Sequence, residues 1–393
     1  MNYNFDVEMD RKNTGSFKWD WCHQIFGTDD LIPMSIADMD IPVPPQVIQA
    51  IHKRNEHPVF GYTVRTDSYF NSVINWMNKR YNWEVDKDWI LSTPGIVPAI
   101  SFAVFSFTEP GDKILIQPPV YHPFFDAIEL NKRILIENPL KEIHNGGKIH
   151  YEIDFEDLEA KLDGVKMMIL CSPHNPVGRV WTREELDRIG KICKAKGVII
   201  LSDEIHSDLI YKPFKHIPFS SLTDFQEVSL TCMAPSKTFN VAGLCASVVI
   251  IPNQQLRDRF LKSMFNCGVF LGNVFGNVVL ETCYNDCEDW LENLLDYLKQ
   301  CKSDIEKFFE LNLPQLKVAD TEATFLTWID FRNLNFKTHE ALEKFIIEKA
   351  KIGLDTGSKF GEQGKFFMRL NFGCNRKTIN EALIRLKSAI DQL

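Results

Sequence analysis

The chain has 393 residues, 45% of them hydrophobic, and a formal net charge of −9 at pH 7. This length allows one large domain with a smaller companion. The charge is spread along the chain without a basic block, so we expect neither nucleic acid nor an anionic membrane as a partner. The first residues lack a basic stretch before an apolar core, and no uncharged apolar run is long enough to span a bilayer, which predicts a cytoplasmic protein.

The ten cysteines are scattered along the chain and contain no Cys-x-x-Cys pair. The nearest approach to one is Cys283 and Cys287, four residues apart on a predicted helix. This spacing, without a histidine beside it, is not that of a zinc site. We therefore expect no metal, and thiols that are reduced and mostly structural.

Apolar runs typical of strands alternate with helical patterns through the middle of the chain. The runs cover residues 113–117, 133–137, 166–171, 198–202, 228–233 and 246–251. Thr182-Arg183-Glu184-Glu185 is a capping-box sequence, which predicts a helix that ends near Lys196 with Gly197 as its C-cap. Such alternation predicts an α/β fold with a mostly parallel sheet covered by helices.

The pattern changes after about residue 280. Residues 281–311 form a long, acidic, helical stretch, followed by a short strand at 324–329 and amphipathic helices at 338–352 and 376–393. We expect residues 46–280 to form the large domain. Residues 1–45 and 281–393 are expected to form a smaller α+β domain.

The segment Ser92-Thr93-Pro94-Gly95-Ile96-Val97 precedes the apolar helical stretch 100–107. The free backbone N–H groups of Gly95, Ile96 and Val97 at a helix start are suited to binding phosphate. Glycine at position 95 allows a close approach of the backbone. The same residues are equally typical of an ordinary helix start.

Three polar residues each follow a separate apolar run: Asn175 after 166–171, Asp203 after 198–202 and Lys237 after 228–233. Open α/β sheets bind ligands at the carboxyl ends of their strands. There, an amide can donate to a ring oxygen, a carboxylate can keep a pyridine nitrogen protonated, and a lysine can hold an aldehyde as an imine. Taken singly, these residues are typical of a turn, a helix cap and a surface lysine. Together, they favour a cofactor site.

With the late Arg369, these motifs resemble the pyridoxal-phosphate enzymes of the aspartate aminotransferase fold, which is fold type I of the class I and II aminotransferase superfamily. The resemblance runs nearly end to end and implies pyridoxal 5'-phosphate as the cofactor and a seven-stranded sheet. The chain is also similar to the branch of cystathionine β-lyase-like C–S lyases in Ala37-Asp38-Met39-Asp40, Phe60-Gly61-Tyr62-Thr63 and the run from Ser236 to Gly243.

The resemblance implies roles for further residues. Tyr62 would reach the phosphate of a neighbouring subunit, which implies a homodimer with shared active sites, although a tyrosine in this position could equally be a core or turn residue. Tyr121, after the strand 113–117, would lie against the cofactor and remain free for proton transfer. Arg369 would grip the α-carboxylate of a small amino-acid substrate, and Asn175 would also contact the substrate. His206 would bond the phenolic oxygen of the cofactor, orient Asp203 or simply be a satisfied buried histidine.

The sequence departs from aminotransferases of this fold at the phosphate site. They carry an arginine a few residues after the lysine, whereas this chain reads Val241-Ala242-Gly243-Leu244-Cys245. The phosphate is therefore expected to rely on backbone amides, Ser236 and Tyr62.

The expected activity is β-elimination from cystathionine or a related S-substituted cysteine, with Lys237 removing the α-proton. The thiol would leave, and pyruvate and ammonia would follow. Transamination with a 2-oxo acid is the alternative. A regulatory protein without catalysis would be expected to lose Lys237, Asp203 or Arg369, and all three are present.

Overall fold

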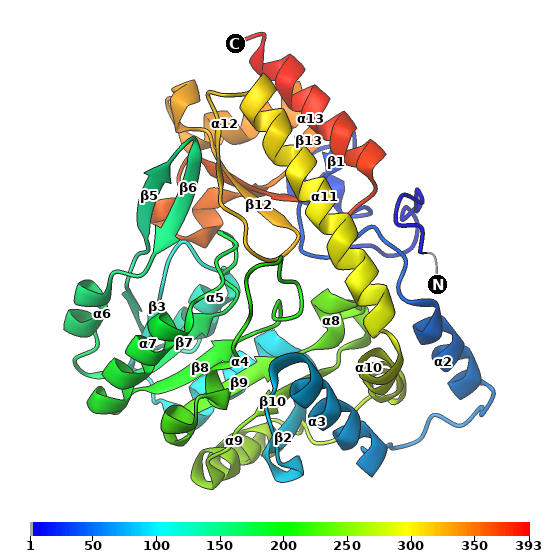
Figure 1. Ribbon diagram of the computed structural model, residues 1–393, viewed down its shortest axis with the longest axis vertical. Helices are drawn as coiled ribbons and strands as arrows, with labels where there is room; N and C mark the ends of the chain where they lie inside the picture. Colours follow the sequence, from blue (N-terminus) through cyan, green and yellow to red (C-terminus); the bar gives the residue numbers. More distant parts are fainter. Residues whose placement is uncertain (1–2) are drawn as a thin grey trace.

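The computed structural model describes residues 3–393 and contains a seven-stranded sheet, a six-stranded sheet and a short pair of strands (Figure 1). The larger sheet has seven strands in the order β2-β10-β9-β8-β7-β3-β4. Only β10 pairs antiparallel with its neighbours, and the remaining pairs are parallel. The strands are β2 (Ile90–Thr93), β3 (Lys113–Ile116), β4 (Ile134–Glu137), β7 (Val165–Cys171), β8 (Ile199–Asp203), β9 (Ser229–Met233) and β10 (Ser247–Ile250). The predicted seven-stranded, mostly parallel sheet is confirmed, and β2 is the strand that the six apolar runs did not include.

Helices cover both faces of this sheet. Because side chains alternate along a strand, Met167 and Ile169 of β7 pack into one apolar cluster, and Met168 and Leu170 into another. The first cluster is closed by α4 (Ile96–Phe107), α5 (Pro123–Glu129) and α9 (Gln254–Asn266). The second is closed by α6 (Phe155–Lys161) and α7 (Arg183–Lys196). Burial on both faces explains why the strands read as continuous apolar runs.

The predicted capping box at the start of α7 is present. The Thr182 hydroxyl accepts from the Glu185 N–H, and the Glu185 carboxylate accepts from the Thr182 N–H. The helix ends at Gly197 in the left-handed conformation, with φ 68°. This helix therefore begins and ends where its sequence predicts.

The smaller sheet has six strands in the order β14-β15-β12-β11-β6-β5. They are β5 (Lys141–Asn145), β6 (Lys148–Glu152), β11 (Lys317–Ala319), β12 (Leu326–Asp330), β14 (Asp355–Thr356) and β15 (Phe367–Asn371). The β5–β6 hairpin lies inside the range 46–280 predicted for the large domain, yet β6 pairs with β11. The domain boundaries stay a prediction. The pairing of β6 with β11 joins a strand of the predicted large domain to a strand of the predicted small domain.

Strands from the first and the last parts of the chain pair in the smaller part of the molecule. There, β1 (Ile32–Pro33) pairs with β13 (Ile352–Gly353). The remaining helices of the first third are α1 (Cys22–Phe26), α2 (Pro45–Asn55) and α3 (Asp67–Tyr81), and α10 (Val274–Asp286) packs against α2 and α3. The long α11 (Glu288–Asn312) runs from the larger part of the molecule to the smaller one (Figure 1).

Two predicted helices differ from the structure. The single helix expected at 281–311 is two helices, α10 and α11, separated at Cys287, whose φ −113° and ψ 10° are not helical. The helix expected at 338–352 is α12 (His339–Phe345) with a wider turn over Ile346–Ala350, and it stops at Lys351 in the left-handed conformation. The chain then enters β13. The last helix, α13 (Arg376–Ile390), and the short α8 (Pro235–Thr238) complete the fold.

Within residues 3–393, every helix is too short or too polar to cross a membrane. All ten cysteine thiols are free, and eight of them are buried. Cys283 and Cys287 both lie in the core beside α11.

Candidate active site

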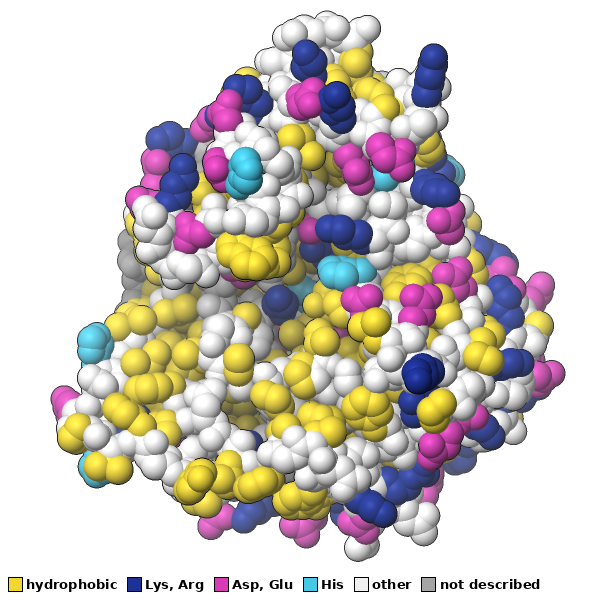
Figure 2. All heavy atoms as spheres, turned by 180° about the vertical axis from the view of Figure 1, so that it is seen from behind, with side chains coloured by type: hydrophobic (Ala, Val, Ile, Leu, Met, Phe, Trp, Pro, Cys, Tyr) yellow, Lys and Arg dark blue, Asp and Glu magenta, His cyan; other side chains and the backbone are white. Residues whose placement is uncertain are grey.

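A cavity of about 210 Å³ opens at the carboxyl ends of the parallel strands of the larger sheet. On the space-filling surface, the molecule is hollowed between its smaller upper part and wider lower part (Figure 2). The register aligns Cys171, Asp203 and Cys232 across β7, β8 and β9, so the loops that follow these strands converge. The lining includes Ala37, Gly95, Ile96, Val97, Pro98, Tyr121, Cys171, Asn175, Asp203, Ile205, His206, Ser236, Lys237 and Ala242.

Lys237 lies in α8, directly after β9, and its amine Nζ donates to the backbone oxygen of Ala37 at 2.7 Å. Burial lowers the pKa of this amine to about 8, against the opposing effect of the Asp38 carboxylate. Arg369 lowers the pKa further, and Asp203 raises it. A lysine in this state has a substantial neutral fraction near pH 8, as a nucleophilic amine or a general base requires.

The segment that supplies the Ala37 oxygen is firmly attached to the lysine loop. The Asn240 side chain accepts from the Met39 N–H and donates to the backbone oxygens of Met39 and Ile41. Arg11 pairs with both Asp38 and Asp40 at 2.7 Å. The motif Ala37-Asp38-Met39-Asp40 thus closes one wall of the cavity. The contact between this motif and Lys237 joins residues 200 positions apart and is not predictable from the sequence pattern.

Asp203 is the last residue of β8, and 3% of its surface is exposed. Burial raises the pKa of its carboxyl to about 7, and the neighbouring Glu204 acts in the same direction. The Ile205 N–H donates to Asp203 Oδ1 at 3.2 Å and, with Lys237, opposes this rise in pKa. A buried carboxyl without a cationic hydrogen-bond partner is suited to meeting a protonated ring nitrogen.

Asn175 links the cavity to Arg369. The Arg369 Nη1 donates to Asn175 Oδ1 at 2.9 Å, so the amide nitrogen of Asn175 is the end that remains for a ligand. Arg369 lies on β15 and also donates to Asp355 Oδ2, from Nε at 3.2 Å and from Nη2 at 2.5 Å. Its side chain is only 3% exposed. Asp355 is a site residue that sequence analysis missed, because only the pairing of β14 with β15 brings it to Arg369.

Tyr121 and His206 both line the same cavity. Burial, with a contribution from Asp203, raises the pKa of the Tyr121 hydroxyl to about 12, so it is protonated at neutral pH. Burial lowers the pKa of His206 well below its usual value, so the ring is neutral. His206 Nδ1 is buried and has no hydrogen-bond partner within residues 3–393, which does not fit a satisfied core histidine.

The start of α4 forms the narrow end of the cavity. Gly95 has φ 153° and ψ 167°, a conformation that residues with a side chain rarely adopt. The N–H groups of Ile96 and Val97 belong to the first turn of α4, and Pro98 contributes none. Ser236 lines the cavity from the lysine loop. These groups are suited to an anion such as phosphate.

Tyr62 is the one predicted cofactor-binding residue that lies away from this cavity. It is 98% exposed and stands in a loop between α2 and α3. Its expected contact with a neighbouring subunit stays a prediction.

The cavity fits pyridoxal 5'-phosphate in the chemistry of its donors. Lys237 is suited to the aldehyde, Asp203 to the ring nitrogen, and Asn175 with the unpartnered His206 to a ring oxygen. The first turn of α4 and Ser236 are suited to the phosphate. These groups follow four different strands, and the fold brings them to one edge of the sheet.

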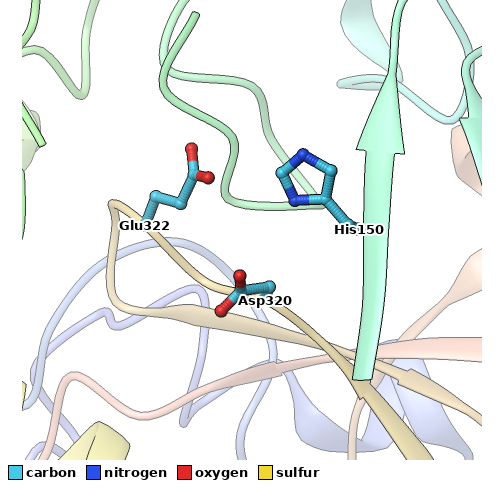
Figure 3. A group of neighbouring side chains, drawn as sticks. All are labelled: His150, Asp320 and Glu322. Carbon is cyan, nitrogen blue, oxygen red and sulfur yellow. The ribbon is translucent and has the colours of Figure 1, made fainter. Parts of the chain in front are cut away.

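A second cluster, of His150, Asp320 and Glu322, faces a common space from β6 and the turn after β11 (Figure 3). Arg179 already occupies this space. It donates to Glu322 Oε2 at 3.1 Å and to His150 Nε2 at 3.0 Å. Asp320 lies 3.7 Å from the Lys148 amine. We read this cluster as an ion-pair network and assign no metal to it, because the guanidinium would repel a cation.

Residues 29–386 match the family model of aminotransferase class I and II. The chain is 42% identical over 390 residues to cystathionine beta-lyase PatB of Bacillus subtilis (strain 168), with 98% of this chain and 100% of that protein covered. Among solved structures, cystalysin from Treponema denticola, which contains a pyridoxal 5'-phosphate cofactor, matches with a TM-score of 0.95, 39% identity and 100% of both chains covered. A PLP-bound putative aminotransferase from Clostridium difficile 630 matches with a TM-score of 0.96 and 43% identity, and the match covers 99% of this chain and 100% of that chain.

Proposed function

The chain belongs to the aminotransferase class I and II family, and on that premise we propose that it is a pyridoxal 5'-phosphate-dependent C–S β-lyase. It cleaves L-cystathionine or a related S-substituted cysteine to a thiol, pyruvate and ammonia. The observation that carries this proposal is the convergence of Asn175, Asp203 and Lys237 on one cavity, with Arg369 bonded to Asn175. Relatives named as cystathionine beta-lyases support the choice of reaction.

When bound, pyridoxal phosphate supplies an aldehyde and an electron-withdrawing ring that stabilises negative charge at the α-carbon of an amino acid. Lys237 would hold the aldehyde of the bound cofactor. As a free amine with a lowered pKa, Lys237 accepts the α-proton of the substrate. Asp203 would keep the ring nitrogen protonated.

Arg369 orients the substrate by its carboxylate. The α-proton is thereby directed at Lys237 Nζ, which already lies close to the Ala37 oxygen in the same cavity. The thiolate leaves from the β-carbon as the C–S bond breaks, and water converts the remaining three-carbon fragment to pyruvate and ammonia. The protonated Tyr121 hydroxyl is suited to giving a proton to the departing sulfur.

We further propose that two copies of the chain form the enzyme. The loop between α2 and α3 exposes apolar side chains at Val59 (60%), Phe60 (54%), Tyr62 (98%) and Val64 (72%). Monomeric proteins rarely expose so many neighbouring apolar groups. Apolar side chains also gather over the lower part of the face shown in Figure 2. In such a dimer, Tyr62 of each copy serves the phosphate of the other, in place of the arginine that aminotransferases carry near the lysine.

The ten free thiols support a reducing compartment, and we place the enzyme in the cytoplasm.

The experiment that tests the proposed reaction is product analysis with L-cystathionine. Free thiol, pyruvate and ammonia are followed together, with and without 2-oxoglutarate. Equal amounts of all three products without an acceptor support β-elimination. Turnover that needs the acceptor would identify an aminotransferase instead.

A further inference from the structure

Arg369 has only part of its hydrogen-bonding capacity left for a substrate. A guanidinium carries five N–H donors. Asp355 Oδ2 accepts from Nε and Nη2, and Asn175 Oδ1 accepts from Nη1. One N–H on each terminal nitrogen therefore remains, and two such donors are what a carboxylate needs for a bidentate contact.

Asp355 is fixed by its place in the sheet. It lies on the edge strand β14, directly across from Arg369 on β15, and its side chain is 14% exposed. A carboxylate in this position neutralises part of the Arg369 charge and prevents the guanidinium from rotating about its long side chain. Arg369 also stacks on Phe360, with its Cζ 4.9 Å from the ring centre. The flat group is thus held by partners at its edge and on its face.

The same Asp355 oxygen reaches the wall that contacts Lys237. The Ile36 N–H donates to Asp355 Oδ2 at 3.1 Å. Ile36 has φ 56°, an unfavourable conformation for a β-branched residue that persists only when neighbouring groups hold it. The next residue, Ala37, offers its backbone oxygen to Lys237. One carboxylate thus holds both the arginine and the segment that contacts the lysine.

We propose that Asp355 is a positioning residue for substrate recognition. It fixes Arg369 so that the two remaining N–H groups meet the α-carboxylate. This inference rests on the proposed function, because it assigns Arg369 to the substrate. Its consequence is a preference for amino acids with a free carboxylate over their amides, since an amide cannot accept two charge-assisted hydrogen bonds in the same way.

The test compares the wild type with Asp355→Asn, Arg369→Ala and the double variant, all loaded with cofactor. Asparagine keeps the shape of Asp355 and can still accept from Ile36, but it lacks the charge. The substrates are S-ethyl-L-cysteine and its α-carboxamide. Calorimetric binding of L-alanine, which has no thiol to lose, is measured in parallel. Asp30→Asn, which removes an exposed partner of Lys351, is the matched control.

For Asp355→Asn, we expect the KM for S-ethyl-L-cysteine and the dissociation constant for L-alanine to rise roughly 10-fold to 100-fold. A rise of this size corresponds to the loss of one charge-assisted contact between Arg369 and the α-carboxylate. The kcat should change far less, the carboxamide should be hardly affected, and the double variant should be no worse than Arg369→Ala. Equal losses on both substrates, or losses that add in the double variant, would overturn the proposal. If Asp355→Asn unfolds, Asp355→Ser replaces it in the same comparison of single and double variants. If the wild type cleaves neither thioether, the proposed function fails, but L-alanine binding still decides the role of Asp355.

Discussion

Replacing Asp203 by asparagine should stabilise the protein without its cofactor, while removing its activity. The buried carboxyl has its pKa raised from 3.8 to about 7. The folded state therefore binds this proton more tightly than the unfolded state, and stability is lost as the pH rises from about 4 to 7. At about 1.36 kcal/mol per pKa unit, the ionised carboxylate costs the fold about 4 kcal/mol above pH 7.

An asparagine in place of Asp203 cannot ionise, so the variant avoids this cost. Its side-chain oxygen can still accept from the Ile205 N–H, as the aspartate does. The gain in stability should be below about 1 kcal/mol at pH 4 and about 4 kcal/mol at pH 8. For a chain of this length, the latter corresponds to a rise in Tm of roughly 5 °C.

The assay is differential scanning calorimetry of cofactor-free wild type and Asp203→Asn at pH 4, 6 and 8. All other titrating groups are shared, so the difference between the two proteins reports on this carboxyl together with its effect on the pKa of Lys237. Asp163→Asn is the control, because Lys196 lowers the pKa of that exposed carboxyl and its replacement should stabilise at no pH. An Asp203→Asn protein that is no more stable than the wild type at pH 8, or equally stabilised at pH 4 and pH 8, would refute the reasoning.

Three further predictions concern the carboxylate, the phosphate and the fold. Arg369→Ala should raise the KM for L-cystathionine about 30-fold to 900-fold, because two charge-assisted contacts worth about 2 to 4 kcal/mol are lost; an unchanged KM in steady-state assays would place the carboxylate elsewhere. Gly95→Ala should weaken cofactor binding by about 1 to 3 kcal/mol in a spectroscopic titration, because φ 153° strains a side chain; Gly111→Ala, at φ 91° and outside the cavity lining, should leave cofactor binding unchanged. Thr182→Ala should lower the free energy of unfolding by about 1 kcal/mol through the lost cap, with activity retained; an unaltered denaturation midpoint would contradict the role of that cap.

The sequence predicts the larger sheet well, and it also predicts which residues meet in the cavity at its carboxyl edge, for a local reason. The central strands β7, β8 and β9 are almost entirely buried, so they read as largely apolar runs, and the polar residues at their carboxyl ends stand at the sheet edge. Asn175, Asp203 and Lys237 are found in this way. The strand β2 is short and contains two hydroxyl residues beside two apolar ones, so it does not form an apolar run that predicts a strand.

The smaller part of the molecule is less predictable, because its order depends on contacts between distant segments. The β5–β6 hairpin has a recognisable signal, Asn145-Gly146-Gly147 between two alternating runs, but its pairing with β11 spans more than 150 residues. The break between α10 and α11 at Cys287 is not marked by a proline or a glycine, so the sequence pattern does not predict it. Asp355 contacts Arg369 only because β14 pairs with β15, so composition and spacing do not predict its role at the site.

The central claim is that Lys237 carries the cofactor at the carboxyl edge of the sheet. The most direct test is reduction of the cofactor-loaded protein with borohydride, followed by peptide mapping by mass spectrometry. We predict the pyridoxyl phosphate group on the peptide that contains Lys237 and its absence in Lys237→Ala. A modification on another lysine, or none on a protein that still releases pyruvate from L-cystathionine, would contradict the claim.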